Sequence, residues 1–212
     1  MKKVYFISGL GADKRVFSFL DLSFCEPIFI DWISPFKKES LKDYALRLRK
    51  EIKDENPTII GISFGGMLAT EMAKADKRTK VIIISSAKLS SEIPTYFKAA
   101  KYLPAYKLFP AALLKNFTLL FKGMLGAKGE FQKKLLKQII TGTDTTFLKW
   151  AISAIVNWGN KIVPENLIHI HGTADKVLPY KLVKANYTIE NGTHVMPMNN
   201  YGEISLLLKN LS

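Results

Sequence analysis

Four short runs of β-branched and aromatic residues constrain the fold of this chain most. They read VYFI, PIFI, TIIGI and VIII, and they occupy residues 4–7, 27–30, 58–62 and 81–84. None of them alternates polar with apolar residues, which is typical of strands that helices cover on both faces. The runs therefore predict a parallel sheet buried between two layers of helices.

Helical periodicity fills the segments between these runs. Apolar residues recur at helical spacing over residues 40–53 and again over residues 64–72. Ser40, with Asp43 three places further on, is typical of a helix start. Strands that alternate with helices predict right-handed crossovers in a doubly wound α/β sheet.

Residues 88–146 interrupt this rhythm. They contain no convincing strand but several Leu-rich and aromatic stretches, namely TYFKAAKYL, PAALLKNFTLLF and FQKKLLKQII. Strand-like runs resume at residues 166–170 and 185–189, and a last amphipathic stretch covers residues 201–211. We therefore expect a single α/β domain over residues 1–212, a three-layer sandwich with about six mostly parallel strands and a helical lid inserted after the fourth.

Composition favours an ordinary globular protein, with 48% hydrophobic and 23% charged residues. No apolar run approaches the roughly 20 residues that cross a bilayer, and the start of the chain is too brief for a signal sequence. Cys25 is the single cysteine, so no internal disulfide calls for an oxidising compartment. These features predict a cytoplasmic protein without a transmembrane segment.

The chain is strongly basic, with a formal net charge of +13. Only four of its 31 basic residues are arginine, the residue on which specific phosphate and base recognition relies, so a nucleic-acid partner is not expected. Residues 88–146 hold ten lysines against three acidic residues. Such a lid could meet an anionic substrate or an acidic membrane surface, or its lysines could simply form a solvated face.

Residues Gly61–Gly65 read G-x-S-x-G directly between the third strand-like run and the following helical pattern. A serine hydroxyl becomes a useful nucleophile only when it is held exposed beside a base, and a sharp turn from strand to helix holds it so. The pattern therefore indicates Ser63 as a nucleophile.

An acid and a histidine follow in the chain order that this arrangement uses. Asp175 lies in HGTADKVLP just beyond the fifth strand-like run, and His194 lies in NGTHVMP just beyond the sixth. The carboxyl ends of parallel strands share one edge of a sheet, so Ser63, Asp175 and His194 are expected to meet there.

Other candidates fit the chemistry less well. Asp31 and Asp144 do not follow a late strand, while His169 lies inside a strand-like run and His171 beside Gly172, which favours structural roles for both histidines. The lone cysteine is more typical of buried packing than of a nucleophile.

Metal and dinucleotide sites are not expected. Three histidines and one cysteine give no familiar metal-ligand spacing. The segment SGLGAD after the first run lacks the third glycine of a dinucleotide-binding loop. No cofactor is needed for the reaction that a serine nucleophile performs.

These motifs give the chain a clear resemblance: over nearly its whole length it looks like a small, esterase-like serine hydrolase of the α/β-hydrolase superfamily. The matching pieces are SGLGADKRVF, GISFGG, HGTADKVLP and GTHVMP. The resemblance implies Ser63 as nucleophile, Asp175 as acid and His194 as base. It also implies that the loop from Ser8 to Gly11, which carries serine where many relatives have histidine, supplies the Leu10 amide to an oxyanion hole together with the Phe64 amide.

The expected function is therefore cleavage of an ester or thioester of a small molecule through an acyl-enzyme. Aromatic residues of the lid favour an apolar acyl or aryl group. They are Tyr96, Phe97, Tyr102, Tyr106, Phe109, Phe117 and Phe121. A lyase, a C–C hydrolase or another reaction on the same fold, and a non-catalytic ligand-binding protein, remain alternatives.

Overall fold

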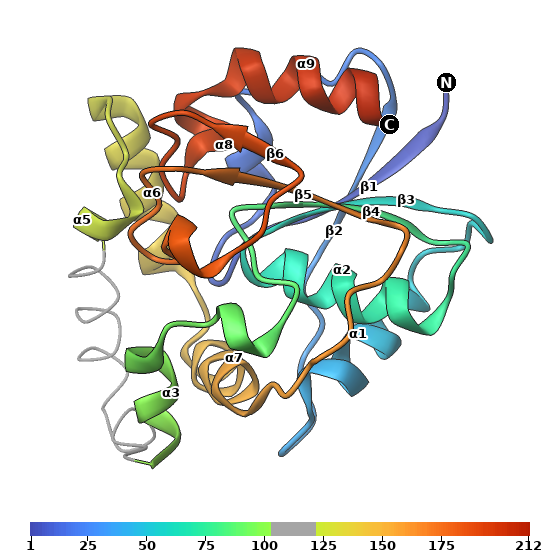
Figure 1. Cartoon of the computed structure of the whole chain (residues 1–212), viewed down its shortest axis with the longest axis vertical. Helices are drawn as coiled ribbons and strands as arrows, with labels where there is room; N and C mark the ends of the chain where they lie inside the picture. The colour runs from blue at the N-terminus through green and yellow to red at the C-terminus, as the bar shows by residue number, and fades with distance from the viewer. Residues whose placement is uncertain (103–121) are drawn as a thin grey trace.

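The computed structural model describes residues 1–102 and 122–212 of the chain (Figure 1). Within them, six strands form one sheet in the order β2-β1-β3-β4-β5-β6, and each neighbouring pair is parallel. The strands are β1 (Lys3–Ile7), β2 (Glu26–Ile30), β3 (Thr58–Ile62), β4 (Lys80–Ile84), β5 (Leu167–Gly172) and β6 (Tyr187–Ile189). Each coincides with one of the apolar runs, so the predicted parallel sheet of about six strands is confirmed.

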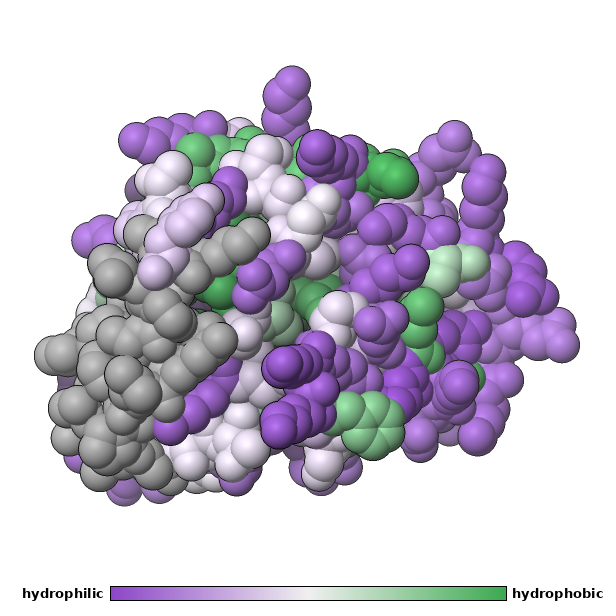
Figure 2. All heavy atoms as spheres, turned by 90° about the horizontal axis from the view of Figure 1, so that it is seen from below, coloured by the Kyte–Doolittle hydropathy of each residue, from purple (hydrophilic) through white to green (hydrophobic). Residues whose placement is uncertain are grey.

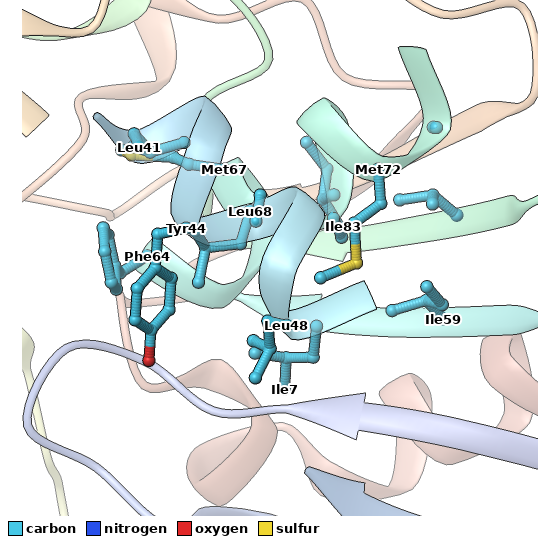
Figure 3. Packing of buried hydrophobic residues seen from close by; sticks show 14 of the residues in the cluster. Ile7, Leu41, Tyr44, Leu48, Ile59, Phe64, Met67, Leu68, Met72 and Ile83 are labelled. Carbon is cyan, nitrogen blue, oxygen red and sulfur yellow. The ribbon is translucent and has the colours of Figure 1, made fainter. Parts of the chain in front are cut away.

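One face of the sheet is covered by α1 (Leu41–Arg49), α2 (Phe64–Ala75) and α7 (Thr145–Asn157), which lie below it in Figure 1. Ser40 caps α1 as predicted, because its side chain accepts a hydrogen bond from the amide of Asp43. The helix ends at Arg49 rather than near residue 53, and the guanidinium of Arg49 donates to the carbonyls of Ile52 and Asp54. Figure 3 shows the core that results. Its labelled side chains are Ile7, Leu41, Tyr44, Leu48, Ile59, Phe64, Met67, Leu68, Met72 and Ile83.

The opposite face is covered by η1 (Lys14–Phe17), α6 (Glu130–Gly142), α8 (Met196–Asn199) and α9 (Tyr201–Leu211). Strand residues alternate between the two cores, so that Val4 and Phe6 point to this second layer while Tyr5 and Ile7 point to the first. Because helices bury both faces, the strands carry no polar alternation.

The chain between β4 and β5 is helical where it is described. It contains η2 (Ser90–Glu92), α3 (Thr95–Tyr102), α5 (Lys122–Leu125) and α6 before α7 begins. The predicted stretch PAALLKNFTLLF lies outside the described residues. Helix α7 was not predicted; Asp144 caps it, and Phe147, Ala151 and Ala154 give it a buried stripe.

The two ends of the chain meet at the edge of the sheet where β1 begins (Figure 1). The side chain of Lys2 donates a hydrogen bond of 3.0 Å to the backbone carbonyl of Ser212. No helix among the described residues is long and apolar enough to span a bilayer.

Candidate active site

Ser63 occupies the sharp turn between β3 and α2. Its φ of 51° and ψ of −117° lie in a region that non-glycine residues seldom adopt. Two hydrogen bonds hold its backbone there, from its own amide to the carbonyl of Ile84 at 2.9 Å and from the hydroxyl of Ser86 to its carbonyl at 2.6 Å. The turn therefore presents the Ser63 hydroxyl at the carboxyl end of the sheet.

Glycines make this turn sterically possible. A methyl group on Gly61 would stand 2.6 Å from the carbonyl oxygen of Gly65, and one on Gly65 would collide with the carbonyls of Ile7 and Ser8. The motif thus packs the start of α2 against the ends of β1 and β3 at a distance that no larger residue allows.

His194 lies in the loop between β6 and α8, and its buried ring contacts both other predicted residues. Its Nε2 is 2.9 Å from the Ser63 Oγ, and its Nδ1 is 2.8 Å from Oδ2 of Asp175. Ser63, His194 and Asp175 therefore form one continuous hydrogen-bonded chain, although they lie far apart in the sequence.

Asp175 is buried in the loop after β5, and each of its oxygens is bonded. Oδ1 accepts hydrogen bonds from the amides of Val177 and Leu178 at 2.8 and 2.9 Å, and Oδ2 faces His194. Burial would raise the pKa of this carboxyl, but the charge and the hydrogen bond of His194, together with the Leu178 amide, lower the pKa below its usual 3.8. Asp175 is therefore ionised at neutral pH.

The predicted oxyanion loop lies directly beside Ser63. A methyl group on Gly9 would be 3.4 Å from the Cβ of Ser63. The hydroxyl of Ser8 donates to the carbonyl of Ala12 at 2.8 Å and so closes the loop. Among the described residues, the amides of Leu10 and Phe64 have no hydrogen-bond acceptor.

The insertion between β4 and β5 contacts each of the three loops around Ser63. The hydroxyl of Tyr96 donates to the carbonyl of Val177 in the loop of Asp175 at 2.9 Å. The hydroxyl of Thr193, next to His194, donates to Gly126 at 3.2 Å, and the hydroxyl of Thr143 donates to Gly11 of the oxyanion loop at 2.8 Å.

The two glycines at these contacts are both required by their geometry. Gly11 has a φ of 69° and Gly126 a φ of 77°. A methyl group on either would approach the threonine that faces it within 2.8 Å. Sequence reasoning missed Thr143 and Gly126, because contacts between residues so far apart in the chain leave no local pattern.

The lid aromatics are only partly described. Phe97 packs against the core, and Tyr96 is half-exposed. Tyr102 is 81% exposed, which does not fit the predicted lining of a pocket. The remaining four, Tyr106, Phe109, Phe117 and Phe121, lie outside the described residues.

Two hollows of the described surface are not lined by Ser63 or His194. One of about 300 Å³ lies behind Gly11, between Trp32 and Thr143. The other, of about 1080 Å³, lies between residues 35–42 and α7. Figure 2 shows the molecule from below, where the described surface is largely hydrophilic.

No group of three or more His, Cys, Asp or Glu side chains among the described residues is arranged to hold a metal ion. His169 and His171, for which a structural role was predicted, are fully buried on β5. Lys88, counted with the basic residues of the lid, is buried too, against Glu92.

No family model matches the sequence, and no curated protein matches it. Solved structures do resemble the fold over almost the whole chain. An esterase from Exiguobacterium antarcticum aligns with a TM-score of 0.74 at 14% identity, covering 99% of this chain and 91% of that one. A thermophilic esterase from Thermogutta terrifontis gives a TM-score of 0.76 at 13% identity, covering 99% and 89%. An enol-lactonase from Burkholderia xenovorans gives 0.75 at 12% identity, covering 99% and 90%.

Proposed function

The chain has the α/β-hydrolase fold, and from that premise we propose that it is a serine hydrolase that cleaves an ester or thioester. Ser63 is the nucleophile, His194 the general base and Asp175 the acid that orients the histidine. The observation that carries the proposal is the pair of hydrogen bonds on the two nitrogens of His194, 2.9 Å to Ser63 and 2.8 Å to Asp175.

The protonation states follow from these contacts. An ionised carboxylate only accepts hydrogen bonds, so Asp175 requires the proton of neutral His194 to be on Nδ1. The lone pair of Nε2 then faces the Ser63 hydroxyl and receives its proton as Oγ attacks the substrate carbonyl. The negative charge of Asp175 stabilises the imidazolium that results.

The developing oxyanion needs donors that are already in position. The amides of Leu10 and Phe64 are the proposed donors, because Phe64 follows Ser63, Leu10 follows the Gly9 that lies against Ser63, and neither amide has an acceptor among the described residues. The alcohol or thiol then leaves with a proton from His194. Water, activated by the same histidine, hydrolyses the acyl-enzyme.

The insertion is the proposed lid, and its contacts with the loops of Asp175, His194 and Gly11 support this role. Because these contacts involve the loops around Ser63 and not the three triad side chains, the lid would act on substrate selection more than on bond breaking. Lactones, which are cyclic esters, belong among the substrates to be tried.

Labelling with a fluorophosphonate probe tests the nucleophile. Wild type should react, and Ser63→Ala should not. Ser85→Ala is the matched control, because Ser85 is also a serine with a positive φ, 48°, at a strand end, yet its hydroxyl is buried and has no hydrogen-bond partner among the described residues. Labelling that persists in Ser63→Ala, or wild type that does not react, would contradict the proposal.

A panel of p-nitrophenyl esters, lactones and acyl thioesters then identifies the substrate class. Asp175→Asn should lower kcat by about 10⁴-fold, since an amide at this position no longer enforces the required tautomer of His194. An Asp175→Asn enzyme with wild-type kcat would remove Asp175 from the mechanism.

A further inference from the structure

A row of buried polar side chains leads from the base of the insertion to Asp175. Lys88 and Glu92 lie shortly after β4, while His169 and His171 lie two residues apart on β5 and point to the same side of the sheet. Nothing in the proposed mechanism uses these four residues. Buried charges and imidazoles are costly unless every polar atom is bonded, so their contacts define their role.

Lys88 starts the row as a donor. Its Nζ contacts three acceptors, namely Oε1 of Glu92 at 3.4 Å, Nδ1 of His169 at 3.3 Å and the carbonyl of Lys184. An ammonium group has three protons and no acceptor. The three contacts can therefore take up all three protons, with Nδ1 of His169 as the acceptor; the backbone carbonyl of Ser86 also interacts with the ring of His169.

The donor at Lys88 favours one tautomer of each histidine. With Nδ1 accepting, neutral His169 carries its proton on Nε2, which lies 3.0 Å from Nδ1 of His171. His171 in turn accepts at Nδ1 and carries its own proton on Nε2. Burial lowers the pKa of His169 well below 6.5 and also lowers the pKa of His171, so both rings are neutral at neutral pH.

The Nε2–H of His171 meets the loop that carries Asp175. It donates to the carbonyl of Leu178 at 2.8 Å, and it lies 3.5 Å from Oδ2 of Asp175. The amide of Leu178 donates to the other carboxylate oxygen at 2.9 Å. His171 thus binds the carbonyl of the residue whose amide binds the acid, and its Nε2–H also lies near the carboxylate oxygen that binds His194.

We propose that His171 is a positioning residue for Asp175, kept in its Nε2–H tautomer by the donor chain from Lys88 through His169. With the proton on Nδ1 instead, the lone pair of Nε2 would face the Leu178 carbonyl and the carboxylate, and the loop would move away from His194. The inference rests on the proposed triad. The tautomers themselves can be measured without any turnover.

The first experiment is ¹⁵N NMR of the histidine rings in Ser63→Ala, whose lack of a nucleophile makes the result independent of activity. The chain has three histidines, so one substitution of each assigns the spectra. We expect His169 and His171 as neutral Nε2–H tautomers and His194 as Nδ1–H. A proton on Nδ1 of His171, or a charged His171 ring at neutral pH, would overturn the inference.

The second experiment is kinetic, with a p-nitrophenyl ester as substrate. His171→Leu should lower kcat by about 10- to 100-fold at unchanged KM, because the acid is misplaced but the substrate site is not. His171→Gln should recover most of the loss, since its amide nitrogen can donate from nearly the position of Nε2. Equal losses in both variants, or a wild-type kcat in His171→Leu, would contradict the positioning role.

Lys88→Met tests the far end of the row without touching the acid loop. Lys74→Met is its matched control, because Lys74 likewise pairs with a buried glutamate, Glu71, at 2.8 Å but has no contact with a histidine. We expect kcat to fall several-fold in Lys88→Met and to stay unchanged in Lys74→Met. If His171→Leu does not fold, the comparison of Lys88→Met with Lys74→Met and the NMR spectra test the positioning role instead. Equal kcat values in Lys88→Met and Lys74→Met would contradict it.

Should wild type fail to react with the fluorophosphonate probe while His171 carries its proton on Nε2, the hydrolase proposal fails and the donor chain stands. If the probe reacts but His171 carries its proton on Nδ1, the hydrolase proposal stands and the donor chain fails.

Discussion

Ser63 has a backbone conformation of high energy, and the turn around it requires glycine at positions 61 and 65. Strain of this kind persists only where the surroundings overdetermine it. Here the amide and carbonyl of Ser63 are both bonded to the segment at the end of β4, and Gly61 and Gly65 leave room for the turn. The stability of the turn and the exposure of the nucleophile therefore depend on the same few atoms.

Gly65→Ala should lower the free energy of unfolding by about 1 to 3 kcal/mol and abolish probe labelling, because the added methyl group meets the carbonyls of Ile7 and Ser8. Gly202→Ala in α9 is the control, since a methyl group there has open space, and it should stabilise by up to about 1 kcal/mol. Urea unfolding compares the two. Equal stabilities, with labelling intact, would show that the turn can move aside.

Sequence reasoning at this scale is good where a residue type is tied to a local motif. Ser63, Asp175 and His194 each follow a strand within a short glycine-containing loop, and the structure brings them together; their catalytic roles stay a prediction. The proposed roles of Lys88 and His171 could not be predicted from local motifs, because they depend on which side-chain atoms face each other between β5 and the segment after β4. His171 was judged structural from its neighbour Gly172 alone.

At the scale of elements, α6 is tied to the oxyanion loop by one side chain. Thr143, at the end of this helix, donates to the carbonyl of Gly11, and its neighbour Asp144 starts α7. The helix that borders the site and the helix that covers the sheet thus meet within two residues. A shift of α6 would therefore displace Gly11 and the neighbouring Leu10 amide.

Thr143→Val should therefore lower kcat/KM by about tenfold, equivalent to about 1.4 kcal/mol, because it removes the bond to Gly11, together with the bond to the carbonyl of Ile139 in its own helix, while nearly conserving volume. Thr141→Val is the control on the same helix, since its hydroxyl donates to the carbonyls of Lys137 and Gln138. Kinetics with acetyl to octanoyl esters measure both. If Thr143→Val and Thr141→Val have the same kcat/KM for every ester, the contact between Thr143 and Gly11 does not contribute to activity.

The strands could be predicted because burial on both faces gives them an unmistakable apolar run. Helix α7 could not, because it is apolar on most sides: Leu148 and Val156 are buried as well as Phe147, Ala151 and Ala154, so its sequence shows no clear helical stripe. Tyr102 shows the converse error, since an aromatic side chain in a helical segment was expected to line a pocket and is exposed.

At the scale of the whole molecule, buried histidines make stability depend on pH. Burial lowers the folded-state pKa of His169 and His171. Below about pH 6.5 these two histidines are therefore protonated in the unfolded chain but still neutral in the folded chain. The contribution of the two neutral histidines to the free energy of unfolding is fully present above pH 6.5. It is lost as the pH falls from 6.5 towards their folded-state pKa values. Asp175, whose folded-state pKa lies below 3.8, adds a second loss below that pH.

The free energy of unfolding should accordingly decrease between pH 7 and pH 5, by up to about 1.4 kcal/mol per pH unit for each of the two histidines. Urea titrations at several pH values give the slope, and His171→Gln should reduce it by one histidine's share. A slope that is flat over this range, or identical in the variant, would mean that the unfolded state gains no such protons.

The contact between Lys2 and Ser212 gives the molecule a nearly circular path. A short linker between the two ends would close the backbone into a ring, and a cut between the exposed residues Glu55 and Asn56 would open it again between α1 and β3. Such a circular permutant would begin with the strand that leads to Ser63 and would keep every contact of the site, because the junction lies at the opposite edge of the sheet. The arrangement of the site should therefore not depend on the order in which the segments follow one another along the chain.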